Sequence, residues 1–335
     1  MLKRGIYKLY YTLQFGGACY AWMRVFDKLL GRDKAKKYLY RKSKEVSPEK
    51  YSEELIKIYG AMTGNKLDLN NPYTFNEKIQ WMKLYDTTPL KTRLADKYLV
   101  REWIKEKIGE QYLIPLLGAW DTFREINISD LPDSFVLKMN HGSTWNVVVK
   151  EKERMNWEEV QERFDYWTTI DYAFIIGFEM QYLNIQPKIV AEQYIGDTNG
   201  SLLDYKIHCF HGNPEYIHVI GDRDPDKHRA KEAFYNTEWI LQPFSSGVYP
   251  RYIKEKQKPV NLDEMLRVAR ILSKDFPYVR VDLYELSSGD IKFGEMTFTP
   301  GSGFYHWIPS RMDRELGEKI CLPSKEEHNR YDSSR

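Results

Sequence analysis

Two strand-like runs near the C-terminal end constrain the fold more than any other part of this 335-residue chain. The runs YVRVDLYEL and IKFGEMTFT are rich in β-branched and aromatic residues, as strands usually are. Between them, Ser288-Gly289 is typical of a two-residue turn. The sequence therefore predicts an antiparallel hairpin over residues 278–299.

The register of this hairpin gathers four polar side chains. With Ser288 opposite Gly289, Asp282 faces Glu295 and Arg280 faces Thr297, and residues two apart on a strand share one face. Opposed carboxylates need a cation or a shared proton, and Mg²⁺ prefers hard oxygen ligands beside a phosphate. This favours a metal site with Arg280 placed for a developing oxyanion. The alternative is a surface patch in which Arg280 neutralises the acids.

The order of the expected elements indicates an α+β fold. Helical patterns occupy residues 48–110, and Thr74 with Glu77 fits a capping box before one of them. Strand-like runs begin at residue 134 and mix with helical stretches. The expected segments are residues 1–47, 48–133, 134–195, 196–325 and a polar tail, 326–335.

Composition excludes several classes of protein. Lys and Arg number 50 against 48 Asp and Glu, a smaller basic excess than nucleic-acid binders show, so no nucleic-acid partner is expected. The three cysteines are scattered, which disfavours a disulfide framework and fits a reducing, cytoplasmic location. No apolar run is long enough to span a membrane, and the N-terminal end is not a convincing secretory signal.

The first 44 residues differ from the rest. They are strongly basic and aromatic, and an apolar stripe at helical spacing is formed by Leu2, Ile6, Leu9 and Leu13. Such a segment packs on the main body of a protein or lies on an anionic membrane, here the inner face of the plasma membrane.

The run SFVLKMNHGSTWNVVVK places a small polar turn between two strands. The N–H groups of a turn such as Gly142-Ser143 can close over phosphates, and Lys138 can add a positive charge. Turns of this composition are also common as purely structural elements.

Charged residues elsewhere add further candidates. Asp96-Lys97 begins a helix, and Asp204 and Lys206 share one face of a strand. The turn GDRDPDKHRAK is either a solvated loop or a binding segment. Its candidate substrate-binding residues are Arg223, Lys227 and Arg229.

Several common motifs are missing. The chain has no G-x-x-x-x-G-K-[ST] and no G-x-G-x-x-G, which removes the main support for P-loop and Rossmann readings. His208 and His218 could face each other across a hairpin, but a zinc site there has little support. In PGSG, Gly301 and Ser302 provide a loop where a ligand could approach the backbone closely.

Taken in order, seven blocks resemble the TupA-like ATP-grasp proteins of bacterial cell-surface polysaccharide clusters. The blocks run from about residue 50 to about residue 323 and read NPYTFNEKIQWMKLYD, LADKYLVREWI, FVLKMNHGS, AEQYI, DYKIHCFHG, RVDLY and FGEMTFTPGSGF. The resemblance implies an ATP-grasp fold, in which ATP is held between two α+β lobes.

The resemblance also implies a role for each matching position. Lys97 and Lys138 would bind the ATP phosphates, Asp204 the ribose hydroxyls, and Lys206 would reach phosphate. The loop over the γ-phosphate would be His141, Gly142, Ser143 and Thr144. The adenine-reading hinge would be Glu192, Gln193, Tyr194 and Ile195. The implied metal ligands are Asp282, Glu295 and Thr297, and the implied catalytic residues are Arg280, Lys206 and Ser143.

Two positions depart from the family pattern. Thr297 stands where many ATP-grasp enzymes have Asn, and Thr is a weaker metal ligand than an amide carbonyl. Trp145 stands in a loop that is often glycine-rich, where it would stiffen the loop or offer an aromatic surface to a sugar.

The predicted function is an ATP-dependent carboxylate–amine ligase that uses ATP and Mg²⁺. By resemblance, its acid is a uronic acid of a capsule or cell-wall polysaccharide, or its precursor, and its amine is an amino acid or another small amine. One alternative is a glycosyltransferase, for which Asp222-Arg223-Asp224 would be the D-x-D motif. Another is a non-catalytic component of the polysaccharide assembly machinery, docked on the membrane through residues 1–44.

Overall fold

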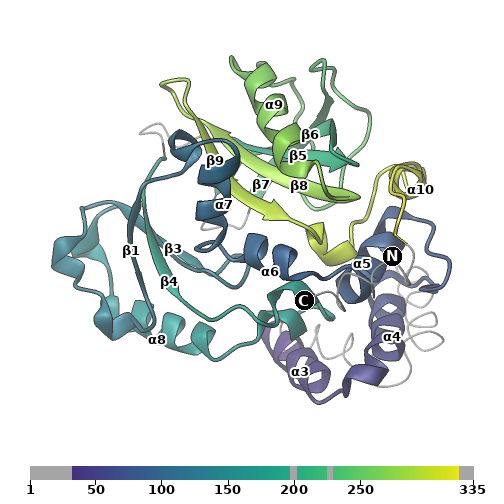
Figure 1. The fold of residues 1–335 in the computed structure, drawn as a ribbon, viewed down its shortest axis with the longest axis horizontal. Helices are drawn as coiled ribbons and strands as arrows, with labels where there is room; N and C mark the ends of the chain where they lie inside the picture. The colour runs from purple at the N-terminus through teal and green to yellow at the C-terminus, as the bar shows by residue number, and fades with distance from the viewer. Residues whose placement is uncertain (1–31, 197–201, 225–228, 324–335) are drawn as a thin grey trace. The chain divides into compact units, whose positions relative to one another are not determined.

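The structure is a computed structural model that describes residues 32–196, 202–224 and 229–323 (Figure 1). The chain divides into two compact units. The first contains the described residues up to Thr88, Asp171–Leu183 and the residues from Thr299 onward, and the second contains Pro89–Ile170 and Asn184–Phe298. Each unit combines distant segments, and the contiguous segments expected above stay predictions. No helix in the described ranges is long and apolar enough to cross a membrane.

The first unit is helical. Its helices are α3 (Arg32–Lys44), α4 (Tyr51–Thr63), α5 (Phe75–Tyr85) and α10 (Arg311–Glu318), with short 3₁₀ turns at Pro48–Lys50, Tyr172–Phe174, Met180–Tyr182 and Pro300–Gly303. The predicted capping box at the start of α5 is confirmed. Thr74 Oγ1 accepts a hydrogen bond from Glu77 N at 3.3 Å, and the Glu77 carboxylate accepts one from Thr74 N at 2.9 Å.

Helix α3, the described end of the basic N-terminal segment, packs within the first unit. Lys42 Nζ lies 2.6 Å from the Glu54 carboxylate, Lys44 Nζ lies 2.7 Å from that of Asp171, and Leu39 is buried. These contacts join the second half of α3 to the first unit, as the packing alternative predicted, and lipid contact of the segment stays a prediction. The stripe of Leu2, Ile6, Leu9 and Leu13 lies outside the described residues.

One face of α5 carries buried polar side chains that hold the Ser302–Tyr305 loop. Gln80 Nε2 donates to Ser302 O at 3.0 Å and to Gly303 O at 2.8 Å. Asn76 Nδ2 donates to Tyr305 O at 2.9 Å, and Asn76 Oδ1 accepts from Tyr305 N at 3.0 Å. These bonds satisfy backbone groups that would otherwise be buried without partners.

Helix α10 packs closely on the start of α5 through Gly317. A Cβ at this position would approach Tyr73 O and lie 2.6 Å from Phe75 N, and backbone atoms cannot move aside as side chains do. We expect Gly317→Ala to lower the free energy of unfolding by about 2 kcal/mol, measured by chemical denaturation. Glu315→Ala, at an exposed position of the same helix, is the control and should change stability by less than about 0.5 kcal/mol. Equal stability of the two variants would contradict this packing.

The second unit contains two antiparallel sheets. The four-stranded sheet has the order β1-β4-β2-β3, with β1 (Leu116–Trp120), β2 (Phe135–Met139), β3 (Asn146–Val149) and β4 (Ile189–Gln193). The five-stranded sheet has the order β7-β6-β5-β8-β9, with β5 (Asp204–Phe210), β6 (Asn213–Asp224), β7 (Arg229–Asn236), β8 (Tyr278–Glu285) and β9 (Ile291–Thr297). The helices of this unit are α6 (Pro89–Ala95), α7 (Val100–Lys107), α8 (Trp157–Thr168) and α9 (Leu262–Ser273).

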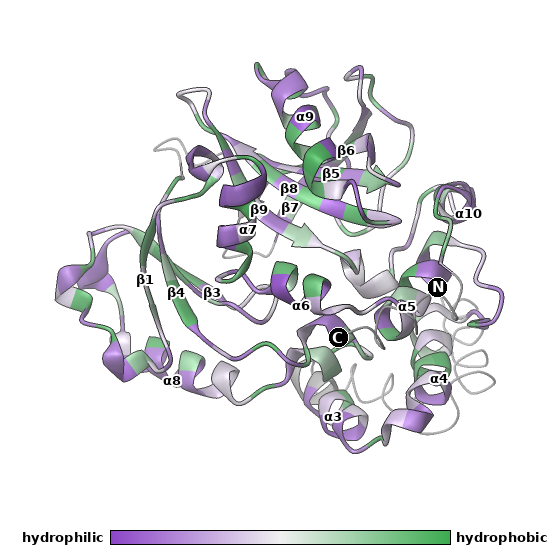
Figure 2. Ribbon diagram, in the orientation of Figure 1, coloured by the Kyte–Doolittle hydropathy of each residue, from purple (hydrophilic) through white to green (hydrophobic). Residues whose placement is uncertain are grey.

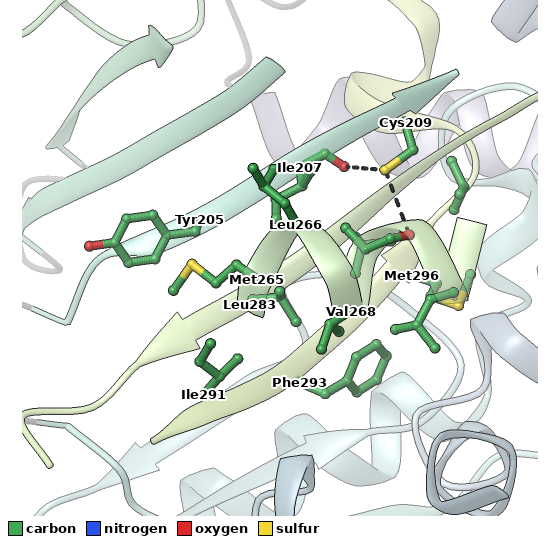
Figure 3. Packing of buried hydrophobic residues seen from close by; sticks show 14 of the residues in the cluster. Tyr205, Ile207, Cys209, Met265, Leu266, Val268, Leu283, Ile291, Phe293 and Met296 are labelled. Carbon is green, nitrogen blue, oxygen red and sulfur yellow. Dashed lines mark hydrogen bonds between the residues drawn. The ribbon is translucent and has the colours of Figure 1, made fainter. Parts of the chain in front are cut away.

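One face of the five-stranded sheet is apolar and lies against α9. Figure 3 shows Ile207 and Cys209 of β5 beside Met265 and Val268 of α9, and burial raises the pKa of the Cys209 thiol to about 12. Figure 2 shows hydrophobic and hydrophilic residues intermixed along these strands. Because strand residues alternate between faces, this core turns the intervening polar residues of β5 and β8 to the opposite face.

The β8–β9 hairpin has a different turn from the predicted one. Glu285 pairs with Ile291, so the connection is longer than the expected two-residue turn. A bulge at Gly294 then shifts the register and places Asp282 opposite Glu295. A Cβ on Gly294 would lie 3.1 Å from Asp282 O, so glycine suits this close approach.

The bulge also changes which residues of β9 face the core. Ile291 and Phe293 pack in the core beside α9, and without the bulge Glu295 would follow them to that face. The predicted pairs of Asp282 with Glu295 and of Arg280 with Thr297 are confirmed, but the predicted two-residue turn was wrong. The longer turn shifts the register by one residue, and the bulge shifts it back.

Candidate active site

The polar patch predicted on the hairpin is present. Arg280 Nε donates to Asp282 Oδ1 at 2.7 Å, and Arg280 Nη2 donates to Asp282 Oδ2 at 2.8 Å. The same Nη2 lies 3.0 Å from Thr297 Oγ1 and 3.4 Å from Glu295 Oε1. One guanidinium therefore contacts both opposed carboxylates and the hydroxyl beside them.

Lysine side chains place positive charge beside the two carboxylates. Lys206 on β5 pairs with Asp282, its cross-strand neighbour. Burial works to raise the pKa of Glu295, but Lys97, Lys206 and Arg280 together lower it. Burial works against protonation of Lys206, but Asp204 and Asp282 raise its pKa. The lowered pKa of Glu295 favours the ionised carboxylate, which is the form that binds a metal.

These residues fit a magnesium ion that is shared with a phosphate. In the described residues no three His, Cys, Asp or Glu side chains are grouped to hold a metal by themselves. Mg²⁺ is commonly held by one or two carboxylates together with substrate phosphates and water. Asp282 and Glu295 supply two such carboxylates on one face of the sheet. The metal role of these two residues and of Thr297 stays a prediction.

A second acidic centre lies at the start of β5. Asp204 pairs with Arg223 and lies 3.8 Å from Lys206 Nζ. Burial raises the pKa of Asp204, but Lys206 and Arg223 outweigh it and lower the pKa. Arg223 was predicted to bind substrate, and in the structure it pairs with Asp204, the residue predicted to bind the ribose hydroxyls.

Tyr284 was missed by the sequence analysis. Burial, Asp204 and Asp282 raise the pKa of its phenol, so it belongs to the same cluster. Its position two residues after Asp282, on the same strand face, was a signal that could have identified it.

Lys97 is held beside the polar turn that follows β2. Its Nζ donates to Gly142 O, and its backbone N donates to Asn140 O at 3.1 Å. Asp96 fixes this corner, because its Oδ2 accepts from Asn140 Nδ2 at 3.0 Å and its Oδ1 accepts from Tyr98 N at 2.7 Å. Burial lowers the pKa of Lys97 despite the opposing effect of Glu295.

Lys138 and Glu192 form an ion pair across the four-stranded sheet. Lys138 Nζ lies 2.5 Å from Glu192 Oε2, and Arg101 Nη1 donates to Glu192 Oε1 at 3.1 Å. Glu192 and Gln193 end β4, and Tyr194 and Ile195 follow it. The adenine-reading role of this segment stays a prediction.

The turn after β2 is tied to the scaffold at both ends. His141 is buried, with Nε2 3.2 Å from Ile170 O. Trp145 stacks on Trp167 of α8 with ring centroids 6.1 Å apart, which agrees with the expected stiffening of the loop. Gly142 is buried, Ser143 half-buried and Thr144 exposed, so Ser143 and Thr144 are the accessible part of the turn.

The remaining candidates belong to other segments of the chain. Gly301 and Ser302 belong to the first unit, Arg229 begins β7 with its side chain exposed, and Lys227 lies outside the described residues. His208 and His218 are both buried with ring centroids 6.0 Å apart. His208 Nδ1 bonds the Tyr278 hydroxyl and His218 Nε2 bonds the Glu232 carboxylate, which fixes the orientation of both rings.

The proposed D-x-D motif ends β6 in a surface cluster. Asp222 lies 3.1 Å from Lys231 Nζ and 3.3 Å from Lys256 Nζ. Arg223 between the two acids is turned to Asp204. This arrangement pairs Asp222 with lysines and gives no support to a metal site under a nucleotide sugar.

The fold is that of an ATP-grasp protein. The TupA-like ATPgrasp family profile matches residues 77–321, and the chain belongs to this family. No curated protein matches the sequence.

Solved structures of two ligases and a synthetase are similar at low identity. D-alanine–D-alanine ligase from Bacillus anthracis, complexed with ATP, is 16% identical (TM-score 0.38), over 70% of this chain and 61% of that one. L-amino acid ligase from Bacillus licheniformis is 15% identical (TM-score 0.42), over 75% of this chain and 57% of that one. N5-carboxyaminoimidazole synthetase from Staphylococcus aureus, complexed with ADP, is 13% identical (TM-score 0.36), over 69% and 53%. The chain thus spans about three fifths or less of their lengths.

Proposed function

We propose that this protein is an ATP-dependent carboxylate–amine ligase that amidates a uronic acid of a bacterial capsule or cell-wall polysaccharide, or its precursor, with an amino acid or other amine. One observation carries the proposal: Asp282, Glu295 and Arg280 share one face of a sheet with Lys206. Opposed carboxylates for Mg²⁺, a lysine for phosphate and an arginine for an oxyanion are the groups that acyl-phosphate chemistry needs.

The reaction has two balanced steps. An oxygen of the substrate carboxylate attacks the γ-phosphorus of ATP, which forms an acyl phosphate and releases ADP. The amine nitrogen then attacks the acyl carbon, the C–O bond to phosphate breaks, and the nitrogen loses a proton to give the amide.

The chain's own residues orient these groups and stabilise charge. Lys97 and Lys138 bind phosphate oxygens, and Arg280 stabilises the oxyanion of the tetrahedral intermediate. Asp282 and Glu295 would hold Mg²⁺, which would neutralise charge on the phosphates. Ser143 and Thr144 provide the accessible N–H and hydroxyl groups of the phosphate-covering turn.

Isothermal titration with a non-hydrolysable ATP analogue, with and without Mg²⁺ and against UDP-sugars, tests the nucleotide half of the proposal. Mg²⁺-dependent binding of the ATP analogue alone supports a ligase. Uronic acids and amino acids are then screened in pairs for phosphate release. Binding of UDP-sugar instead of ATP would favour the glycosyltransferase, and binding of neither would favour a non-catalytic role.

Thr297 allows a test by gain of function. We expect Thr297→Asn to tighten Mg²⁺ binding in the presence of the ATP analogue by a few-fold, because an amide carbonyl is a better hard ligand than a hydroxyl. The measurement is a Mg²⁺ titration at fixed analogue concentration. Thr168→Asn on α8 is the control and should leave the titration unchanged. Equal Mg²⁺ affinity of Thr297→Asn and wild type would argue against Thr297 as a ligand.

A further inference from the structure

We propose that Arg101 is a positioning residue for the nucleotide phosphates: it holds Glu192, on which Lys138 rests, and stays paired with Glu192 when Lys138 turns to phosphate. The inference rests on the proposed nucleotide site. It assigns a role to Arg101 of α7, for which the resemblance implied none, and to the side chain of Glu192, which the sequence analysis placed only in the adenine-reading hinge.

The three side chains come from three different elements and meet at one carboxylate. Glu192 on β4 uses Oε2 for Lys138 of β2, at 2.5 Å, and Oε1 for Arg101, at 3.1 Å. Arg101 Nη2 donates to Ile114 O at 2.8 Å, so its guanidinium is fixed at both ends. The side chains of Arg101, Lys138 and Glu192 are 13%, 17% and 7% exposed, so water screens this pairing little.

A bound triphosphate competes with Glu192 for the ammonium group of Lys138. A triphosphate carries more negative charge than one carboxylate, so the ammonium group turns toward it when nucleotide binds. Without Arg101, Glu192 would then be a buried carboxylate without a close cation, which is strongly unfavourable. Arg101 removes this penalty and makes the transfer of Lys138 possible.

The five-stranded sheet repeats this arrangement. Asp282 is shared between Lys206 and Arg280, and Asp204 between Lys206 and Arg223. In each case a lysine and an arginine share one carboxylate. The geometry points to a common device, in which lysines are held on carboxylates before nucleotide binds and arginines keep those carboxylates paired afterwards.

Binding of a non-hydrolysable ATP analogue with Mg²⁺ and binding of adenosine test the inference. We expect Arg101→Gln to weaken binding of the analogue about tenfold, because the released Glu192 has lost its second cation. Adenosine has no phosphates, so Lys138 stays on Glu192 and adenosine affinity should be unchanged. Arg101→Lys keeps the charge and should retain most of the affinity. Arg163→Gln on α8, where the partner is Glu159 at the surface, is the matched control and should bind like wild type.

The double variant separates positioning from a general electrostatic effect. In a Glu192→Gln background no carboxylate remains that could lose its cation. Adding Arg101→Gln should therefore lower the affinity for the ATP analogue by less than about threefold. An equal loss in both backgrounds, or a matching loss of adenosine affinity, would overturn the inference. If wild type binds no analogue at all, the proposed nucleotide site fails instead, and the two failures are thereby distinguished.

Discussion

Glu295→Gln should abolish Mg²⁺-dependent ATP binding and turnover while leaving the protein folded. The amide lacks the negative charge that holds the metal, and loss of the metal's charge stabilisation lowers turnover by about a thousandfold. The fold should survive, because the Glu295 side chain is 32% exposed and its 3.4 Å contact with Arg280 is long for an ion pair. We expect the free energy of unfolding to change by about 1 kcal/mol or less.

The matched control for this variant lies on the same hairpin. Asp290 is exposed in the turn and bonds Ser288 Oγ at 2.8 Å, away from the patch. Asp290→Asn should bind the ATP analogue with the Mg²⁺ dependence of wild type. Calorimetry gives the dependence, and circular dichroism checks the fold of both variants. Full Mg²⁺-dependent turnover in Glu295→Gln would remove the metal assignment of the hairpin.

Asn76→Ala should destabilise the first unit by about 3–5 kcal/mol. The amide side chain makes buried hydrogen bonds to both backbone groups of Tyr305 and donates to Asp313 Oδ2 at 3.0 Å. Alanine leaves these backbone groups without those partners, and each orphaned buried group costs about 1–3 kcal/mol. Urea denaturation gives the free energy of unfolding, and the backbone around Tyr305 should become more sensitive to proteolysis because its hydrogen bonds to Asn76 are lost.

Asn65→Ala provides the comparison. Asn65 is exposed in the same unit, after the end of α4, so its replacement should change stability by less than about 0.5 kcal/mol. Similar denaturation midpoints for the two variants would show that Asn76 does not anchor the loop. A change of slope in Asn76→Ala would show that the surface exposed on unfolding, or the two-state character of the transition, has changed.

The sequence predicted those features that depend on neighbours along the chain. The capping box at Thr74 and Glu77 needs only local backbone geometry and is present. The α+β class followed from the order of helical and strand-like periods. The pairing of Asp282 with Glu295 was also predicted, but through a turn that the structure does not have.

Features that depend on packing between distant segments escaped prediction. The bulge at Gly294 is required because Ile291 and Phe293 face the core while Glu295 faces the polar patch. A glycine in a strand-like run indicates that a bulge is possible, but it does not show at which residue the register shifts. Arg101 was missed for a related reason, because its partner Glu192 is far away in sequence and only the folded sheet brings them together.

By itself the sequence determined the class of fold, the family and which acids, lysines and arginines could carry chemistry, because motifs and periodicity are local properties. Only the tertiary structure decided which of these charges share a carboxylate. An unpaired buried charge is unfavourable, so Lys138 and Lys206 each pair with a carboxylate. The packing of strands that are remote in sequence determines which carboxylate that is. The pairings of Lys206 with Asp282 and Lys138 with Glu192 therefore could be found only in the folded molecule.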